Sequence, residues 1–257
     1  MRLSPLDPLD RWLAPAPNPR KVAWLSGTTF AHRGLHGPGV PENSLAAVRA
    51  AVEQGLGIEC DVQRAGDGQA VVFHDWELER LTGGSGSLAA LTPAQFAQLR
   101  LLGTAEAVPT LRQVLDTVAG RTPLLIELKS RRDRRIDALC LAVHRVLEGY
   151  RGPHAVMSFD PRVSRWFARH APLTARGLVI TEDNDQALPG RLRRHFDLWI
   201  ARPDFLAYDV RDLPSRFAAA QRRRGLPLAT WTVNSRERAE RARRHADAPI
   251  AEGVGIG

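Results

Sequence analysis

Lysine is nearly absent from this chain. Its 257 residues include 36 lysines and arginines, but only Lys21 and Lys129 are lysines. The net charge of +8 is therefore carried by arginine. A charge this positive could indicate a nucleic-acid partner, but the arginine runs at 131–135, 222–224 and 236–245 are far apart in the sequence. We interpret them as solvated helix faces, and we expect no nucleic-acid partner.

Cysteine and long apolar stretches are also scarce. Cys60 and Cys140 form no CxxC pair, which argues against a disulfide framework. No stretch approaches the roughly 18 consecutive apolar residues that a membrane-spanning helix needs. The first residues, MRLSPLDPLDRWLAPAPNPRK, carry acids and prolines where a signal peptide has an apolar run. We therefore expect a cytoplasmic protein with no stable membrane insertion; the sequence indicates no oligomeric state.

Short apolar runs alternate with helical patterns along the chain. This alternation predicts an α/β fold, and about eight strands indicate a closed (β/α)8 TIM-type barrel. We expect an N-terminal extension over 1–27, the barrel over 28–257, and a small insertion after the third strand at about 76–108. The predicted strands lie within 28–34, 56–63, 70–75, 123–130, 154–159, 175–180, 204–209, 228–233 and 248–253.

Too few residues separate Glu59 from His74 for a helical crossover, which needs about a dozen. A hairpin that turns at 65–68 is the simpler prediction. With its turn centred near residues 66 and 67, Glu59 lies opposite His74 and Asp61 lies opposite Val72.

Acidic side chains share a face of two predicted strands. Glu59 and Asp61 are two residues apart on one strand, so both project from the same side. Glu127 and Lys129 repeat this spacing on another strand. Neighbouring anions on a mostly buried strand require a positive partner. Three carboxylates without a thiolate suit one hard divalent cation, Mg²⁺ or Ca²⁺.

Other polar groups stand at the same strand ends, which in a barrel all face one mouth. Arg33 and Lys129 would make that mouth a receptor for an anion such as phosphate. His32 and His74 could serve as general base and general acid. Each residue alone more often has a structural role, but together they predict cleavage of a phosphodiester. Trp231 could line the mouth or pack in the core.

The motifs that carry these residues resemble those of the glycerophosphodiester phosphodiesterase family, from about residue 28 almost to the C-terminus. They are AHRG, PENS (41–44), IECDVQ, VVFHD, PTL (109–111), IELK, MSF and TWTVN. The resemblance implies a barrel related to phosphatidylinositol-specific phospholipase C, with an insertion after the HD motif. It also implies hydrolysis of a small glycerophosphodiester to sn-glycerol 3-phosphate and an alcohol. The ending ADAPIAEGVGIG departs from the family, whose members commonly finish the last strand with Thr-Asp.

By motif position, the resemblance assigns each candidate site residue a role. It implies acid/base catalysis by His32 and His74 and one divalent cation held by three carboxylates. The implied metal ligands are Glu59, Asp61 and Glu127, and the implied substrate-binding residues are Arg33, Lys129, Glu42 and Asn43, to which we add Trp231.

Two other functions remain open from the sequence. One is a lysophospholipase D or sphingomyelinase D-like enzyme, which would use the same two-histidine chemistry on a lipid. The other is a non-catalytic protein that binds anions or nucleic acid through its basic surface, with salt-dependent affinity. The paired histidines and carboxylates argue against a simple binding protein, because binding alone has no use for both.

Overall fold

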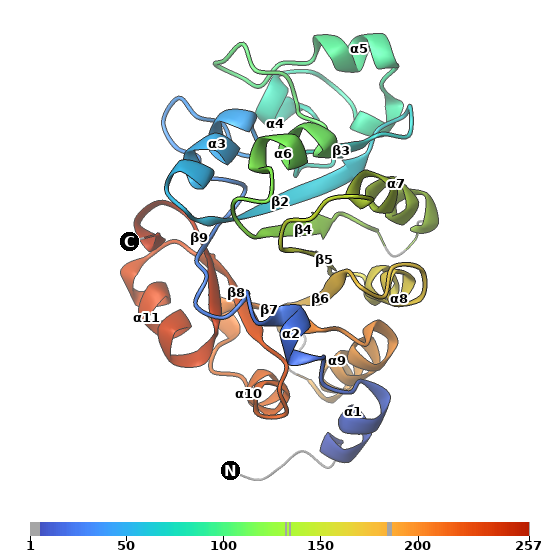
Figure 1. Ribbon diagram of the computed structural model, residues 1–257, viewed down its shortest axis with the longest axis vertical. Coiled ribbons are helices and arrows are strands. Elements are labelled where there is room, and N and C mark those ends of the chain that lie inside the picture. Colours follow the sequence, from blue (N-terminus) through green and yellow to red (C-terminus); the bar gives the residue numbers. More distant parts are fainter. Residues whose placement is uncertain (1–5, 132, 134, 184–186, 257) are drawn as a thin grey trace. The chain divides into compact units, whose positions relative to one another are not determined.

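The computed structural model of this chain describes residues 6–131, 133, 135–183 and 187–256, and it contains a nine-stranded sheet (Figure 1). The strand order is β1-β9-β8-β7-β6-β5-β4-β2-β3, and β1 also pairs with β2, so the sheet closes on itself. The fold is the predicted TIM-type barrel of eight parallel strands, to which β3 adds antiparallel to β2. The strands are β1 (Phe30–Ala31), β2 (Gly57–Arg64), β3 (Ala70–Val72), β4 (Leu124–Leu128), β5 (His154–Ser158), β6 (Ala175–Ile180), β7 (Phe205–Asp209), β8 (Leu228–Val233) and β9 (Ala248–Ala251).

The helices begin where the sequence offers capping side chains. Ser44 accepts a hydrogen bond from the Ala47 N–H, and Thr110 accepts one from the Gln113 N–H. The helices are α1 (Asp7–Leu13), α2 (Pro19–Val22), α3 (Leu45–Glu53), α4 (Glu79–Thr82), α5 (Pro93–Gln98), α6 (Leu111–Val118), α7 (Asp137–Leu147), α8 (Pro161–His170), α9 (Leu188–Ala201), α10 (Arg216–Arg223) and α11 (Arg236–His245). The short 3₁₀ helices are η1 (Leu88–Ala90), η2 (Val210–Asp212) and η3 (Gly253–Gly255). No helix among the described residues is long and apolar enough to cross a membrane.

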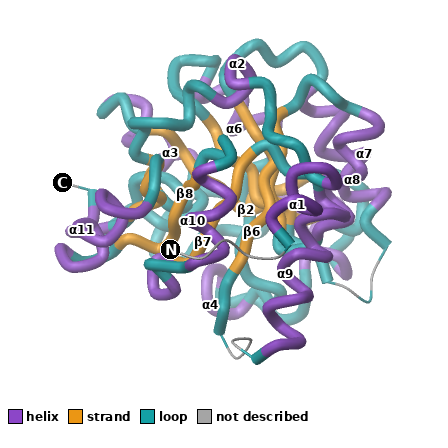
Figure 2. Tube along the Cα trace, turned by 90° about the horizontal axis from the view of Figure 1, so that it is seen from below, coloured by secondary structure: helices purple, strands orange, loops and turns teal. Residues whose placement is uncertain are grey.

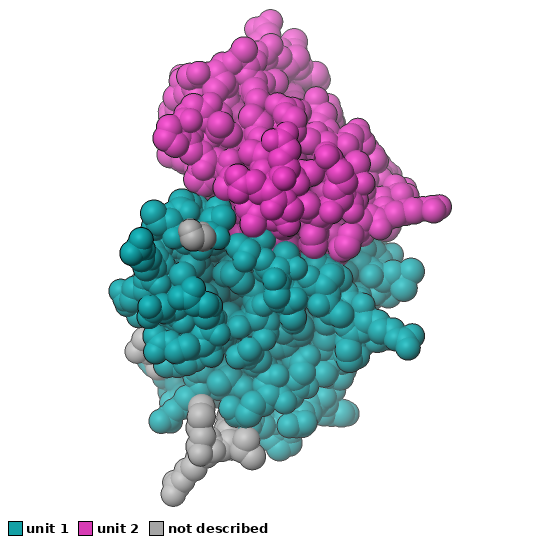
Figure 3. Space-filling model, turned by 60° about the vertical axis from the view of Figure 1, so that its left-hand side comes forward, with its two compact units in different colours: residues 1–29, 155–257 teal, residues 30–154 magenta. Residues whose placement is uncertain are grey.

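The chain divides into two compact units, coloured separately in Figure 3. One unit comprises residues 1–29 and 155–257, and the other comprises residues 30–154. The second unit contains β1 to β4 and every candidate site residue except Trp231. Residues 1–5 of the expected N-terminal extension lie outside the described residues. The division into an extension, a barrel and an insertion stays a prediction.

Helix α1 lies beside α9 in the first unit (Figures 1 and 2). Asp10 of α1 is fully buried. One of its oxygens accepts hydrogen bonds of 2.8 Å from His195 Nδ1 and Trp199 Nε1, and the other accepts one of 2.7 Å from Gln221 Nε2. These three bonds attach α1 to α9 and α10.

The segment between β3 and α6 builds a small core of its own in the second unit. It holds α4, η1 and α5, and it buries Leu78, Leu88 and Leu101 against Phe73. This packing fixes the position of α4, which follows β3 and His74 in the chain.

The hairpin between β2 and β3 confirms the predicted antiparallel return, but its predicted register was wrong by one residue. Val72 lies opposite Val62, and the Phe73 N–H donates to the Asp61 carbonyl at 2.9 Å. The prediction assumed a two-residue turn. The actual turn uses a third residue, Gly68, whose φ of +94° glycine adopts at little cost.

The few cysteine and lysine side chains of this protein are all buried or mostly buried. Cys60 and Cys140 are both buried, and burial raises the pKa of Cys60. Lys21 places its ammonium 2.7 Å from Asp204 Oδ2. Both lysine side chains are mostly covered, at 18% exposure for Lys21 and 14% for Lys129.

Candidate active site

The three candidate carboxylates meet at neighbouring strands of the second unit. Glu59 and Asp61 share a face of β2, and the parallel register places Glu127 of β4 directly beside Asp61. One oxygen of each carboxylate lies within 4.8 Å of the others. Exposure of these side chains is only 2% for Glu59, 3% for Asp61 and 12% for Glu127. Three buried acids therefore converge on one small volume.

Burial and mutual repulsion dominate the electrostatics of these acids. Burial and the charges of Asp61 and Glu127 hold the pKa of Glu59 well above its usual range. Burial also raises the pKa of Glu127, although Lys129 opposes the shift. Burial acts in the same direction on Asp61, but Lys129, His74 and Arg33 outweigh it and lower the pKa of that carboxyl.

Two fixed cations border the acidic cluster. Lys129 Nζ lies 2.9 Å from Glu127 Oε1 and 3.3 Å from Asp61 Oδ1, and Arg33 Nε lies 3.3 Å from Asp61 Oδ2. Although burial alone would lower it, the neighbouring carboxylates raise the pKa of the Lys129 ammonium, which stays charged at neutral pH. Glu59 Oε2 accepts a hydrogen bond of 3.0 Å from the Arg33 backbone N–H.

The donor set fits a divalent cation. The oxygens are of the hard type that Mg²⁺ and Ca²⁺ prefer. Burial and the charges of Asp61 and Glu127 raise the pKa of Glu59, and a cation bound between the acids would oppose this shift. These three acids could therefore hold a metal ion.

The loops after β1 and before α3 bring in Arg33 and Asn43 through unusual backbone conformations. Arg33 has φ +55° and Asn43 has φ +57°, values that are uncommon for residues other than glycine. Asn43 is 2% exposed and donates from Nδ2 to Asp61 Oδ2 at 3.0 Å. Glu42 Oε1 accepts from Arg33 Nη1 at 2.7 Å. The structure therefore brings Asn43 to the acidic cluster and Glu42 to the Arg33 guanidinium beside it.

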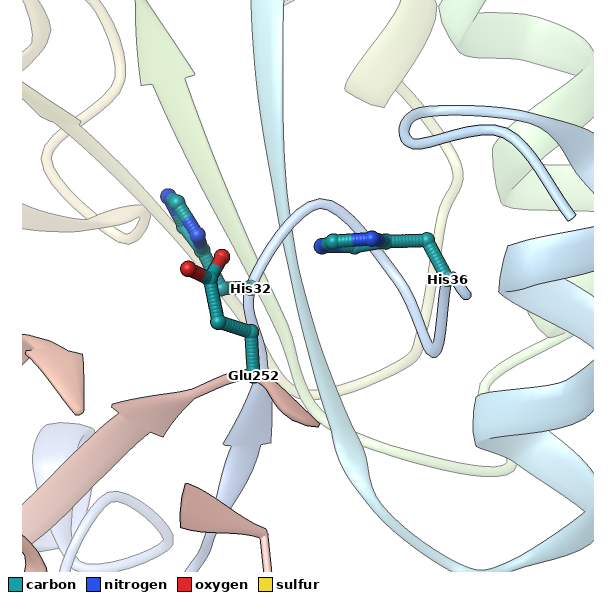
Figure 4. Close-up of side chains that lie close together, drawn as sticks. All are labelled: His32, His36 and Glu252. Carbon is teal, nitrogen blue, oxygen red and sulfur yellow. The ribbon is translucent and has the colours of Figure 1, made fainter. Parts of the chain in front are cut away.

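The two candidate histidines follow β1 and β3. His32 Nε2 is 4.0 Å from Glu59 Oε2. Figure 4 draws the His32 side chain on the loop after β1, with His36 farther along that loop and Glu252 after β9.

His74 is oriented by its neighbour in the sequence. Its Nδ1 lies 2.7 Å from Asp75 Oδ1, which leaves Nε2 as the ring nitrogen available to another partner. Burial lowers the pKa of His74, and the charges of Lys129 and Arg33 add to this effect, while Asp61 and the hydrogen bond that His74 donates to Asp75 oppose it.

The sequence interpretation missed three residues that support this site. Gln63, on the same face of β2 as Glu59 and Asp61, donates from Nε2 to the carbonyls of residues 73, 74 and 75 at 3.1, 3.2 and 2.6 Å. The two-residue spacing 59, 61, 63 was the signal that could have found it. Asp75 and Arg80 form ion pairs behind His74. Arg80 has no comparable signal, because it comes from the irregular segment after β3.

Trp231 belongs to the other compact unit. There its Nε1 donates to the Ala207 carbonyl at 3.0 Å, and its ring packs edge-on against Phe159 with centroids 5.4 Å apart. Its expected place in the substrate site stays a prediction.

Known proteins resemble this chain in sequence and in fold. A sequence model of the glycerophosphoryl diester phosphodiesterase family matches residues 32–250. Glycerophosphodiester phosphodiesterase 1 of Rattus norvegicus is 35% identical over 125 residues, which cover 44% of this chain and 37% of that protein. The glycerophosphodiester phosphodiesterase of Caldanaerobacter subterraneus subsp. tengcongensis is 38% identical over 111 residues, which cover 39% of this chain and 44% of that protein. The aligned part spans less than half of each relative.

One solved structure extends the likeness over nearly the whole chain. It is a phosphodiesterase of Oleispira antarctica, described in complex with the product sn-glycerol-3-phosphate. The two chains are 24% identical, with a TM-score of 0.74, and the match covers 88% of this chain and 93% of that one. This likeness shows that both chains have the same fold.

Proposed function

We propose a hydrolytic function for this chain, which belongs to the glycerophosphoryl diester phosphodiesterase family. Its substrate would be a small glycerophosphodiester, and its products would be sn-glycerol 3-phosphate and an alcohol. The observation that carries the proposal is the convergence of three buried carboxylate oxygens within 4.8 Å, bordered by Lys129 and Arg33. A cytoplasmic location and the absence of a nucleic-acid partner stay predictions.

Glu59, Asp61 and Glu127 would hold one divalent cation, Mg²⁺ or Ca²⁺. When bound, such an ion supplies charge stabilisation at the phosphoryl oxygens. Lys129 and Arg33 would bind the phosphate, because the carboxylates beside them keep both groups charged. Glu42 would orient Arg33, and Asn43 would orient Asp61, through the hydrogen bonds already described.

His32 and His74 would move the protons of the reaction. One imidazole takes a proton from the attacking hydroxyl, and the other protonates the departing alkoxide oxygen. Asp75 holds His74 through Nδ1, so that proton transfer falls to Nε2. If the attacking group is a hydroxyl of the substrate's own glycerol, a cyclic phosphate product will form before sn-glycerol 3-phosphate.

Release of glycerol 3-phosphate from glycerophosphocholine, with and without chelator, tests this function. We expect His32→Ala and His74→Ala each to lose about 10²- to 10⁴-fold in kcat, the usual contribution of a general acid or base. A matched control is His144→Ala on α7, where the imidazole lies 3.7 Å from the more exposed Glu148.

The outcomes separate the candidate functions. Equal hydrolysis by the wild type, both site variants and the chelated enzyme contradicts the assignment. Turnover of lysophosphatidylcholine in preference to glycerophosphocholine supports the lipid-directed alternative. Strong, salt-dependent DNA binding that survives His32→Ala, with no diester cleaved, supports the binding protein.

A further inference from the structure

Arg80 of α4 joins two acidic side chains that each serve a different part of the candidate site. Its guanidinium contacts Asp75 through Nε at 2.5 Å and Nη2 at 2.9 Å. It contacts Glu42 through Nη1 at 3.0 Å and Nη2 at 2.7 Å. Both contacts are bidentate, the geometry that a planar guanidinium provides and an ammonium does not.

Each of these acids holds a residue of the proposed chemistry. Asp75 Oδ1, which Arg80 contacts, is also 2.7 Å from His74 Nδ1. Glu42 Oε1 accepts from both Arg80 and Arg33, each at 2.7 Å. Hydrogen bonds therefore link His74 through Asp75, Arg80 and Glu42 to Arg33, with Arg80 at the middle of this series.

The position of Arg80 suits orientation better than it suits stabilisation of the fold. Its side chain is 51% exposed, and exposed ion pairs add little to the free energy of unfolding. It is also held by α4, whose neighbouring residue Leu78 is anchored in the small core. The backbone of Arg80 is thus held by a packed segment, while its guanidinium contacts the Asp75 and Glu42 carboxylates of the candidate site.

We propose that Arg80 is a positioning residue that fixes the orientation of the His74 ring and of the Arg33 guanidinium together. This inference rests on the proposed phosphodiester hydrolysis. Without the Arg80 guanidinium, the side chains of Asp75 and Glu42 are free to rotate toward water. The His74 ring and the Arg33 guanidinium, which these acids hold, then lose their fixed orientation. Displacements of about 1 Å at a reacting group can cost about 100-fold in rate.

The test compares Arg80→Gln and Arg80→Lys with Arg100→Gln. Arg100 is an exposed arginine of the same segment, and it contacts only backbone carbonyls among its described hydrogen bonds. Steady-state hydrolysis of glycerophosphocholine gives kcat and KM. Nitrogen chemical shifts of the His74 ring in the metal-free protein give its tautomer without any reference to activity, and thermal denaturation checks the fold.

We expect Arg80→Gln to lose about 10- to 100-fold in kcat, with a smaller change in KM. Its His74 ring should change from one fixed tautomer to a mixture, while its Tm stays close to that of Arg100→Gln. The kcat of Arg80→Lys should also stay below that of the wild type, because an ammonium cannot make bidentate contacts with both carboxylates.

Three results overturn the inference. They are wild-type kcat and wild-type His74 shifts in Arg80→Gln, full activity in Arg80→Lys, and a loss of activity explained by a lowered Tm. An inactive wild type contradicts the proposed function instead, and the His74 shifts then still decide whether Arg80 orients the ring.

Discussion

Glu59 is a buried acid with two carboxylate neighbours. Its pKa is well above its usual range because of burial and two neighbouring carboxylates. The folded protein therefore binds a proton at Glu59 at pH values where the unfolded chain has released it. The contribution of Glu59 to the free energy of unfolding then falls as the pH rises from the unfolded value of 4.5 toward the higher folded value.

Replacing this carboxylate should stabilise the metal-free protein at neutral pH. We expect the Tm of Glu59→Gln to match that of the wild type near pH 4 and to exceed it increasingly up to pH 8, since glutamine has no proton to lose. Thermal denaturation in chelator at a series of pH values measures the difference. The exposed Glu53, replaced in the same way, is the control, and a gap that shrinks with rising pH contradicts the expectation.

Which site residues could be predicted depended on how local their signals are. Side chains two residues apart on a strand share one face, and this spacing can be seen directly in the sequence. It predicts that Glu59 lies beside Asp61 and that Glu127 lies beside Lys129. Arg80 contacts Glu42 from 38 positions away through a segment without regular period. Its partnership depends on how that segment packs, and no periodic pattern encodes such packing.

At the scale of elements, one buried acid attaches α1 to α9 and α10. Asp10 accepts three side-chain hydrogen bonds, and these outweigh burial and lower its pKa. The sequence predicted only an N-terminal extension over 1–27, ahead of the barrel. The anchoring by a charged residue could not be read from it, because the donors lie 185 to 211 positions away.

Asp10→Ala should destabilise the protein by about 3–5 kcal/mol, the usual cost of removing one partner of a buried, hydrogen-bonded charge. The reason is that His195, Trp199 and Gln221 would each lose the acceptor for a buried donor. Urea denaturation gives the free energy of unfolding. Asp116→Ala, at an exposed position of α6, should change it by less than about 0.5 kcal/mol. Equal stabilities of the two variants would show that α1 is held by its apolar contacts.

The hairpin of β2 and β3 shows why strand existence is easier to predict than register. Its two strands followed from apolar runs separated by too few residues for a helix. The register depended on whether the turn had two or three residues, and Gly66, Asp67 and Gly68 allow either choice. A difference of one residue moves His74 relative to Glu59, so the turn sets the geometry of the site.

At the scale of the whole molecule, the alternation of nine apolar runs with helical patterns was enough to predict the barrel. Each of the nine predicted runs overlaps a strand of the structure. The fold follows because parallel strands need helical crossovers, and such crossovers leave few arrangements for eight strands. The match with the family over residues 32–250 agrees with this reading.

A bound divalent cation should stabilise the entire fold, because the three acids converge only in the folded chain. At a free ion concentration 100 times the Kd, the gain is about 2.7 kcal/mol, which corresponds to a rise in Tm of roughly 5–10 °C for a chain of this size. Calorimetry with Mg²⁺, with Ca²⁺ and with sodium at matched ionic strength measures it. Identical Tm values in all three solutions would argue that the acidic cluster holds no such ion.

The covered lysines give the surface of this protein an unusual chemical character. Among the described residues, both amine side chains are engaged with carboxylates, so the outward positive charge belongs to guanidinium groups. Guanidinium keeps its proton beyond about pH 12, whereas ammonium groups begin to lose theirs near pH 10. The surface therefore stays cationic in alkaline solution, and acetylating enzymes or amine-coupling reagents find no freely projecting lysine side chain to modify.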